Sequence, residues 1–166
     1  MRPTEAQDVL DNPAVRRVRA ALDAAGIASE IVVLPGAAHT AKLAAEFLGC
    51  DVAQIANSLV FRAESSDTPV LVMSSGARRV DVKKLAAIVG EPIGKADAEF
   101  VRTHTGFAIG GVAPAGHTGT LRRFVERSLA SHDVIWAAAG HPSTVFALSY
   151  AELLRITGGA EIDAAS

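Results

Sequence analysis

The sequence contains little cysteine, few aromatic residues and no excess of positive charge. Cys50 is the single cysteine among 166 residues, which excludes an internal disulfide and a cysteine-pair metal site. Aromatic residues make up 5% of the chain, which argues against the aromatic platforms on which single-stranded nucleic acid stacks. The formal net charge is −2. A nucleic acid would therefore have to be bound by a local basic patch, and no DNA partner is expected.

Long apolar segments are missing as well. No stretch approaches the roughly 18 apolar residues that cross a bilayer, so no membrane contact is predicted. The first residues, MRPTEAQDVLDNP, carry acidic side chains where a signal peptide would need an apolar segment. Together with the unpaired cysteine, this predicts a cytoplasmic protein. The length is that of one ordinary domain, so residues 1–166 are expected to form a single domain.

The usual catalytic motifs are also absent. There is no Gly-x-Ser-x-Gly elbow, and the glycine-rich stretches lack the Lys-Ser/Thr ending of a phosphate-binding P-loop. The histidines show neither a His-x-His nor a His-x-x-x-His spacing. These absences predict that the protein uses no metal, no cofactor and no covalent nucleophile. The five histidines are His39, His104, His117, His132 and His141.

Capping and stop signals predict five helices. The first begins at Asn12-Pro13, an N-cap followed by proline at the first helical position, and stops at Gly26. The other four are AKLAAEFLG, VKKLAAIVG, KADAEFVRTHTG and YAELLRIT. On AKLAAEFLG, helical spacing predicts an apolar side made of Leu43, Ala44, Phe47 and Leu48.

Runs of apolar and β-branched residues predict the strands. The runs IANSLVFR and PVLVMSS should form a hairpin that pairs Leu59–Arg62 with Val70–Ser74. From Gly158 onward we expect a polar tail. Because helices and strands mix without strict alternation, the predicted fold class is α/β (mixed α+β), a single domain with a mixed sheet. The other expected strands are SEIVVLPG, GFAIGG, LRRFVE, DVIWAAAG and TVFALS.

The segment SSGARRVDVKKLA concentrates positive charge. Arg78, Arg79, Lys83 and Lys84 fall within seven residues, after a strand exit at Ser75. The segment can be a solvated helix start, although cations at a helix N-terminus oppose the helix dipole. It can equally be a basic patch that receives a phosphate backbone.

The stretch GGVAPAGH, residues 110–117, is rich in turn-forming residues. Glycine supplies positive φ angles and proline fixes φ, so a simple turn between strands explains it. The same residues suit a loop that a ligand approaches closely. Glycine leaves backbone N–H groups bare, and these can bind a carbonyl or position a water.

Taken in order, these segments resemble the YbaK/prolyl-tRNA-synthetase-associated family, which includes free-standing editing proteins and the editing domain inserted in bacterial prolyl-tRNA synthetases. The resemblance runs from about Asp8 to about Thr157, and its most diagnostic parts are TGFAIGGVAP, Arg79–Leu85 and Gln54–Phe61. It implies a mixed, barrel-like sheet surrounded by helices. It also implies hydrolysis of the ester between a wrong amino acid and the terminal adenosine of a tRNA. Backbone groups and a tRNA hydroxyl would position the water, without a metal or a covalent nucleophile.

The resemblance places the substrate pocket at the Gly-x-x-x-Pro loop. Asn57 and Gly110 occupy the positions expected to be catalytic. The expected partners are the acceptor end of an aminoacyl-tRNA and, beyond it, a synthetase. Contact with tRNA is expected of Arg78, Arg79, Lys83 and Lys84. The expected substrate-binding residues are Ser75, Gly111, Val112, Pro114, Gly140 and His141.

This sequence departs from the family at two of these positions. Family members usually carry lysine where Asn57 stands, so a charged donor is replaced by a neutral amide that both donates and accepts. Some members carry aspartate where Val145 stands, which makes this pocket less polar. Three outcomes follow for the exchange at Asn57: a changed amino-acid specificity, compensation by His141, His104 or Arg79, or loss of catalysis.

Three functions are compatible with these observations. The first is a trans-editing deacylase for a mischarged tRNA, with tRNA for proline or a small amino acid such as alanine, serine or threonine as the expected substrate. The second is a non-catalytic module that binds an aminoacylated tRNA end or a nucleotide-like ligand, which the exchange at Asn57 favours. The third is an accessory subunit of a synthetase, which a large exposed apolar patch would support.

Overall fold

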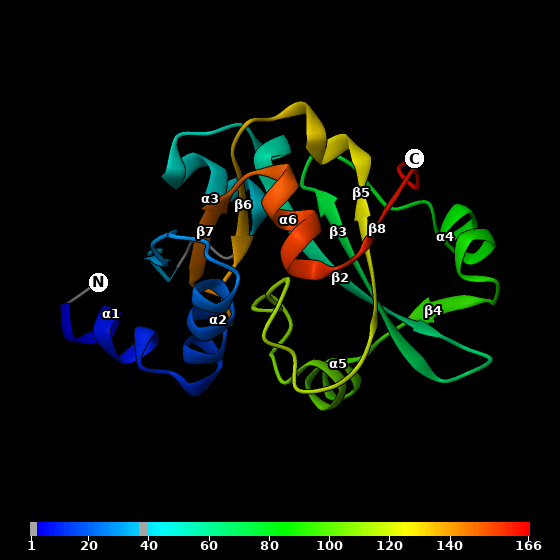
Figure 1. The fold of residues 1–166 in the computed structure, drawn as a ribbon, viewed down its shortest axis with the longest axis horizontal. Coiled ribbons are helices and arrows are strands. Elements are labelled where there is room, and N and C mark those ends of the chain that lie inside the picture. Colours follow the sequence, from blue (N-terminus) through cyan, green and yellow to red (C-terminus); the bar gives the residue numbers. More distant parts are fainter. Residues whose placement is uncertain (1–2, 37–39) are drawn as a thin grey trace.

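The computed structural model describes residues 3–36 and 40–166, so His39 lies outside the described residues. The helices of this part are α1 (Pro3–Leu10), α2 (Pro13–Ala24), α3 (Ala41–Leu48), α4 (Val82–Val89), α5 (Ala98–Thr105) and α6 (Tyr150–Thr157), with short 3₁₀ turns at Val52–Gln54 and Arg127–Ser131. The strands are β1 (Val32–Val33), β2 (Ile55–Ala63), β3 (Thr68–Ser75), β4 (Ile93–Lys95), β5 (Arg122–Glu126), β6 (Ile135–Ala138), β7 (Thr144–Leu148) and β8 (Ala160–Ile162). Figure 1 shows α6 between strands β6 and β7 on one side and β2, β3 and β5 on the other. The predicted mixed α+β class is confirmed.

The central hairpin formed by β2 and β3 is confirmed, with antiparallel pairing from Ala56–Ser75 to Ala63–Thr68. The strand order is β1-β7-β6-β2-β3-β5-β8, and β4 adds to β2. The sheet is mixed because β2–β6, β3–β5 and β5–β8 pair in parallel. On the side away from β3, β6 pairs with β2 at Ile55 and Ala56, and β4 pairs at Phe61–Ala63. Between the parts of β2 that pair with β6 and with β4, residues 57–60 have no strand of the described chain beside them on the side away from β3.

Side-chain caps fix the helix ends where the sequence predicts them. The Asn12 side chain accepts a hydrogen bond from the Ala14 N–H at 2.9 Å, and Pro13 follows as the first residue of α2. The same device starts α3 at Thr40, α4 at Asp81 and α5 at Asp97, and each of these helices ends at a glycine with left-handed backbone. One N-cap of this kind contributes about 1 kcal/mol.

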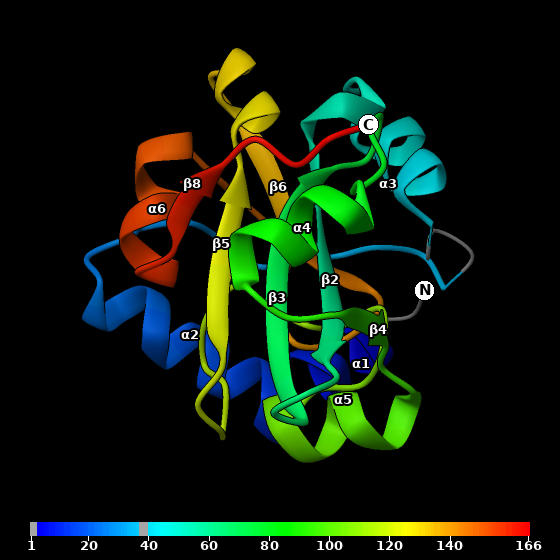
Figure 2. The ribbon, with the colours of Figure 1, turned by 90° about the vertical axis from the view of Figure 1, so that its right-hand side faces the viewer.

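Three apolar clusters hold the helices against the sheet. Val18 and Leu22 of α2 and Leu153 of α6 pack into the first, between the two parts of the sheet. Ala44 of α3 packs into the second. Leu85 of α4 packs into the third, on the other face of β3. Figure 2 shows α4 in front of β2, β3 and β5.

Several local expectations were wrong. The predicted strand GFAIGG is a loop, and residues 106–121 contain no strand. The expected polar tail instead forms β8, which pairs with β5 and buries Ile162. On α3 the buried residues are Ala44 and Ala45, whereas Leu43 and Phe47 are 38% and 55% exposed. Helix α1 and strand β4 were not anticipated, and the run SEIVVLPG yields only the two residues of β1.

Candidate active site

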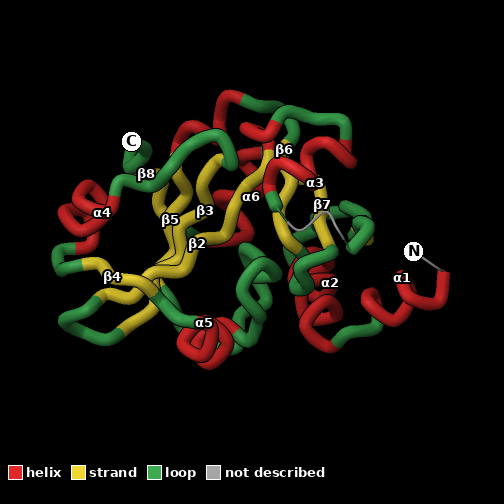
Figure 3. The backbone as a smooth tube through the Cα atoms, turned by 180° about the vertical axis from the view of Figure 1, so that it is seen from behind, coloured by secondary structure: helices red, strands yellow, loops and turns green. Residues whose placement is uncertain are grey.

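The loop after α5 reaches the gap in the sheet beside β2. Figure 3 shows this loop, residues 106–121, between α5 and α2. Residues 111–115 are buried, whereas Gly110 is exposed. Gly110 has a φ of 87°, a backbone conformation that favours glycine. A Cβ on Gly111 would lie 3.0 Å from the backbone of His141. The loop therefore packs against the β6–β7 turn and presents Gly110 at the surface.

Asn57 and Gly110 line one small cavity of about 70 Å³. Asn57 comes from β2 and Gly110 from the loop, while α3 and β7 close the other sides. Most of the lining is apolar, and Val145 lies at the same cavity as Asn57. The lining residues are Leu34, Thr40, Ala41, Ala44, Ile55, Asn57, Gly110, Pro142, Thr144 and Val145.

Of the three polar side chains in this lining, two are engaged by the protein. The Thr40 hydroxyl accepts a hydrogen bond from the Leu43 N–H at 3.2 Å. The Thr144 hydroxyl donates to the His141 carbonyl at 2.8 Å and accepts from the His141 N–H at 3.2 Å. The Asn57 amide forms no hydrogen bond with the described part of the chain. It is therefore available to a ligand, as donor and as acceptor.

The two loop glycines differ in what their amides can offer. The Gly111 N–H donates to the Ala108 carbonyl at 2.9 Å, which closes the turn. The Gly110 N–H has no such bond within residues 3–36 and 40–166. An N–H at the mouth of an apolar cavity can stabilise a developing oxyanion. The Gly110 N–H is thus unengaged by the described residues, whereas Gly111 shapes the turn.

Gly140 and His141 support the loop from the neighbouring turn. Gly140 has a φ of 102°, and a Cβ there would lie 2.8 Å from the Ala14 carbonyl oxygen. The absent side chain lets this turn approach α2. The Nδ1 of His141 accepts from the Ser143 N–H at 3.0 Å, so the proton of the neutral ring sits on Nε2. Both residues lie beside the cavity lining and not within it.

Three further residues expected to bind substrate also lie outside this lining. The Ser75 hydroxyl donates to the Ala53 carbonyl at 2.8 Å and accepts from the Ala77 N–H at 3.3 Å, which holds the exit of β3. Pro114 is buried. Val112 is 3% exposed and borders a second hollow beside Ser58.

The basic residues are separate from the cavity. Arg78, Arg79, Lys83 and Lys84 are all exposed, and the Lys84 Nζ donates to the Ala165 carbonyl at 3.0 Å. In Figures 1 and 2, α4 lies on the far side of the sheet from α3, which borders the cavity. These residues therefore lie apart from the Asn57 cavity.

His117 plays a role that the sequence did not reveal. Its Nε2 donates to the Ala113 carbonyl at 2.7 Å, and its Nδ1 accepts from the Arg123 Nε at 3.4 Å. Burial, opposed by the Ala113 bond and assisted by the positive charges of Arg123 and Arg17, lowers the pKa of His117 to about 4. Arg17 also donates to the carbonyls of Gly106 and Gly116. Because Arg17 is far in sequence from the loop carbonyls to which it donates, spacing alone could not identify this clamp on the loop.

The described residues contain neither a candidate metal site nor a candidate membrane-spanning helix. No group of three or more His, Cys, Asp or Glu side chains is placed to hold a metal ion. No helix in residues 3–36 and 40–166 combines the length and apolar character needed to cross a membrane. His104, considered above as a residue that could compensate for the exchange at Asn57, contacts Phe100 with ring centroids 4.3 Å apart and ring planes tilted by 47°, and it borders a different cavity.

The sequence profile of the aminoacyl-tRNA editing domain matches residues 35–156, which include β2, the Gly110 loop and β7. The chain belongs to the aminoacyl-tRNA editing domain family. The resemblance inferred from the loop and from β2 is thereby confirmed, and the Asn57–Gly110 cavity is a cavity of an editing domain.

Relatives of this editing domain include free-standing and fused proteins. It is 31% identical over 114 residues to the uncharacterized protein YwhH of Bacillus subtilis (strain 168), covering 69% of this chain and 72% of that protein. It is 32% identical over 109 residues to the proline–tRNA ligase of Maridesulfovibrio salexigens, covering 65% of this chain but 17% of the ligase. A crystal structure of a protein whose proposed role is trans-editing for prolyl-tRNA synthetase superimposes with a TM-score of 0.87 at 40% identity, covering 93% of this chain and 98% of that one.

Proposed function

We propose that this editing-domain protein is a trans-acting deacylase, which hydrolyses the ester between a mischarged amino acid and the terminal adenosine of a tRNA. The observation that carries the proposal is the cavity in which the unengaged Asn57 amide and the exposed Gly110 backbone meet. A solved relative at 40% identity has a proposed role beside prolyl-tRNA synthetase. Mischarged tRNA for proline is therefore the first substrate to test, and the cytoplasm is the proposed place of action.

The reaction asks the protein to position groups and not to supply a nucleophile. The water oxygen bonds to the ester carbonyl carbon and the bond from that carbon to the ribose oxygen breaks. One proton of the water passes to the ribose oxygen, the other is released to solvent, and the amino acid leaves as its carboxylate. The Gly110 N–H would donate to the carbonyl oxygen as negative charge develops there. The Asn57 amide would hold the amino acid in reach, and the neighbouring tRNA hydroxyl would orient the water.

The size and lining of the cavity favour a small amino acid. Ala41, Ala44 and Val145 present short apolar side chains around a space of about 70 Å³. Such a pocket suits alanine, serine or threonine. One methyl or hydroxyl changes binding in an apolar pocket by about 1–3 kcal/mol, which is too little for a synthetase to reject such amino acids by binding alone. A separate editing step restores the discrimination.

The basic residues extend the proposal to the body of the tRNA. Arg78, Arg79, Lys83 and Lys84 are exposed together around the start of α4. We place phosphate groups of the tRNA on this surface, because the rest of the chain offers no net positive charge.

The test is the release of amino acid from a panel of mischarged tRNAs. Alanine, serine and threonine are each attached to tRNA for proline, and release is compared with that from buffer and from correctly charged prolyl-tRNA. We expect faster release for at least one mischarged pair and none for prolyl-tRNA. Release at the buffer rate for every pair would contradict the proposal.

A second candidate function is a non-catalytic module that holds the aminoacylated end. The observation that favours it is Asn57 itself, a neutral amide in the cavity at a position where the family resemblance leads us to expect a charged lysine. A binding module would bind the mischarged tRNA and protect the ester, so release would be slower than in buffer. The same panel therefore separates the two functions.

A further inference from the structure

We infer that the 3′ end of the RNA lies in a trough along β2, between Asn57 and Arg62, rather than across α4. The ligand in this inference rests on the proposed function. The trough consists of three hollows in a row. The Asn57 cavity shares Gly110 with a second hollow of about 160 Å³, and the second shares Ala96 with a third of about 560 Å³. The second is bordered by Ser58–Val60 and the third by Arg62.

The backbone of β2 is open where it borders the second hollow. The Ile55 carbonyl accepts from the Gly76 N–H at 2.7 Å, so Ile55 directs its backbone groups toward β3. In an antiparallel pair this orientation alternates, so Ser58 and Val60 direct their N–H and C=O groups away from β3. Neither β6 nor β4 reaches these two residues. Backbone donors and acceptors therefore face the trough without a strand partner in the described part of the chain.

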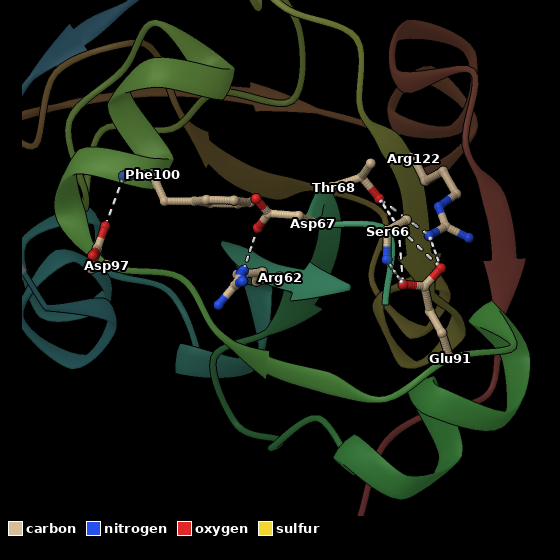
Figure 4. A network of polar contacts seen from close by, with 8 residues as sticks. All are labelled: Arg62, Ser66, Asp67, Thr68, Glu91, Asp97, Phe100 and Arg122. Atoms are coloured by element: carbon tan, nitrogen blue, oxygen red, sulfur yellow. Dashed lines mark hydrogen bonds and ion pairs between the residues drawn. The ribbon is translucent and has the colours of Figure 1, made fainter. Parts of the chain in front are cut away.

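The third hollow combines an aromatic pair with two cations. Phe100 and His104 are in contact, with ring centroids 4.3 Å apart and ring planes tilted by 47°, and both residues border the same space as Arg62 and Lys95. Figure 4 shows the Phe100 ring directed toward the Arg62–Asp67 ion pair at the tip of the hairpin. Carboxylates are present too, and they belong to Asp67, Asp97 and Glu99. The volume falls in the roughly 300–1,000 Å³ range of small-molecule sites.

The length of the trough fits the end of a single-stranded RNA. Arg62 follows Asn57 by five steps along the strand, which span about 17 Å at the usual rise per residue. With the amino acid at Asn57, the terminal adenosine would lie along Ser58–Val60, where the open backbone can pair with base edges or ribose hydroxyls. The nucleotide before it would stack on Phe100, with Lys95 at its phosphate.

An added peptide strand fits the same edge less well. Among the described residues of β2, only Ser58 and Val60 present outward backbone groups that no strand pairs, and the ends of β6 and β4 block extension on both sides. A peptide that binds by strand addition uses a longer run of main-chain hydrogen bonds. The Phe100 ring, by contrast, offers an aromatic face on which a base can stack. Because carboxylates outnumber cations in the third hollow, stacking and not bulk charge should dominate the binding.

The first experiment maps the contact without needing hydrolysis. An uncharged RNA oligonucleotide that ends in CCA is added to the isotope-labelled protein, and backbone amide shifts are recorded by NMR. We expect the largest changes at Ser58, Val60 and Phe100. Changes confined to residues 78–84 would overturn the inference. The inference would also be overturned if the RNA caused no changes while prolyl-tRNA synthetase caused changes at Ser58 and Val60. The open edge of β2 would then bind a protein partner.

The second experiment tests the stacking platform by substitution. Phe100→Leu keeps an apolar side chain but removes the ring, and we expect it to weaken binding of the CCA oligonucleotide about tenfold. Phe100→Trp should bind as well as the natural protein. Phe47→Leu is the matched control, because Phe47 is 55% exposed and borders none of the three hollows. Equal affinity of the Phe100→Leu and Phe47→Leu proteins would overturn the inference.

The kinetic form of this experiment separates the two proposals. If the protein releases amino acid, Phe100→Leu should raise KM for mischarged tRNA and leave kcat nearly unchanged, since Phe100 is remote from the ester. If the Phe100→Leu protein released amino acid with an unaltered KM, RNA binding in the trough would be refuted while the proposed function stood. If the oligonucleotide bound at β2 but no amino acid were released, RNA binding in the trough would be supported and deacylase activity would be refuted.

Discussion

Asn57 and Val145 determine the chemistry of the cavity at the scale of single side chains. Both line the same space, and both differ from residues that the family resemblance led us to expect. The hydroxyls of Thr40 and Thr144 hold local structure, so the Asn57 amide is the lining side chain left for a ligand within the described residues. A neutral amide can orient an ester by hydrogen bonding without the charge of a lysine.

Removal of this amide should cost activity. For Asn57→Ala we expect the rate of amino-acid release to fall at least about tenfold, because a hydrogen bond to the substrate worth about 1–2 kcal/mol is lost. An unchanged unfolding midpoint would show that the fold persists. Asn57→Lys provides the opposing arm. An inert natural protein that gains activity through this change would contradict catalysis by Asn57 and support the binding module.

His117 should make stability depend on pH. In the unfolded chain its pKa is near 6.5, and in the folded protein burial lowers it to about 4. Between these values the unfolded state binds the extra proton, so stability is full above pH 6.5 and falls as the pH drops toward 4. The loss should approach about 3 kcal/mol. Urea unfolding at pH 7 and pH 4.5 measures it.

The matched variants isolate this histidine from the carboxylates, which also titrate. His117→Gln should show a smaller pH dependence than the natural protein. His132→Gln is the control, since His132 takes no part in the hydrogen bonds to Ala113 and Arg123. An equal pH dependence in His117→Gln and the natural protein would refute the assignment.

At the scale of elements, loop 106–121 and strand β8 decide how the site is built. The loop carries Phe107, Val112 and Ala113 into the main core, while Gly110 stays at the surface. Arg17 and His117 hold it by bonds to backbone carbonyls. An irregular loop keeps its shape here because its apolar side chains are buried and its carbonyls are paired.

The contact of the loop with the β6–β7 turn should be sensitive to one methyl group. In Gly111→Ala the new Cβ would lie 3.0 Å from three backbone atoms of His141, so the loop or the turn must move. We expect a loss of about 1–3 kcal/mol in the free energy of unfolding and reduced amino-acid release. Gly36→Ala is the control, because a Cβ there meets nothing within 4 Å. Similar stability of the two variants would show that the contact is loose.

Strand β8 should contribute to stability although its sequence is that of a polar tail. Ile162 is 8% exposed and packs in the cluster under α4. For Ile162→Ala we expect a loss of about 2–4 kcal/mol, measured by urea unfolding. Asp163→Ala, next along the chain, removes an exposed ion pair with Arg127 and should cost less than about 1 kcal/mol. Equal effects would argue that β8 detaches readily.

At the scale of the whole molecule, charge and cavities are distributed over different faces. The net charge of −2 gives no general attraction to RNA. The hollows follow β2 between the loop and α5, whereas the basic residues surround the start of α4. A tRNA that used both would place its 3′ end and its phosphate contacts on separate surfaces.

Salt dependence should distinguish these two surfaces. Each phosphate contact adds about 0.7–0.9 to the slope of log affinity against log salt. The double variant Lys83→Ala/Lys84→Ala should therefore lower the slope for full-length tRNA by about 1.5, if both lysines contact phosphates. The slope for the short CCA oligonucleotide should not change. A tRNA slope identical to that of the natural protein would exclude α4 from the interface.

The sequence alone determined the capped helices, the β2–β3 hairpin and the family. Capping residues such as Asn12, glycine stops, and the apolar runs of β2 and β3 depend on near neighbours in the chain, so they could be recognised directly. The residues of the cavity that carry motif positions, Asn57, Gly110 and Val145, were identified in the same way. Their family motifs lie in continuous segments.

Tertiary structure decided which of these residues meet. Gly111 and His141 are in contact because the loop packs against the β6–β7 turn, and Ser75 and Pro114 are withdrawn into the protein by their own packing and bonds. The open edge at Ser58 and Val60, the bonds from Arg17 to the loop and the pairing of β8 all depend on partners far away in sequence. Such contacts arise when the sheet and its helices bury their apolar faces together, and no local pattern encodes them.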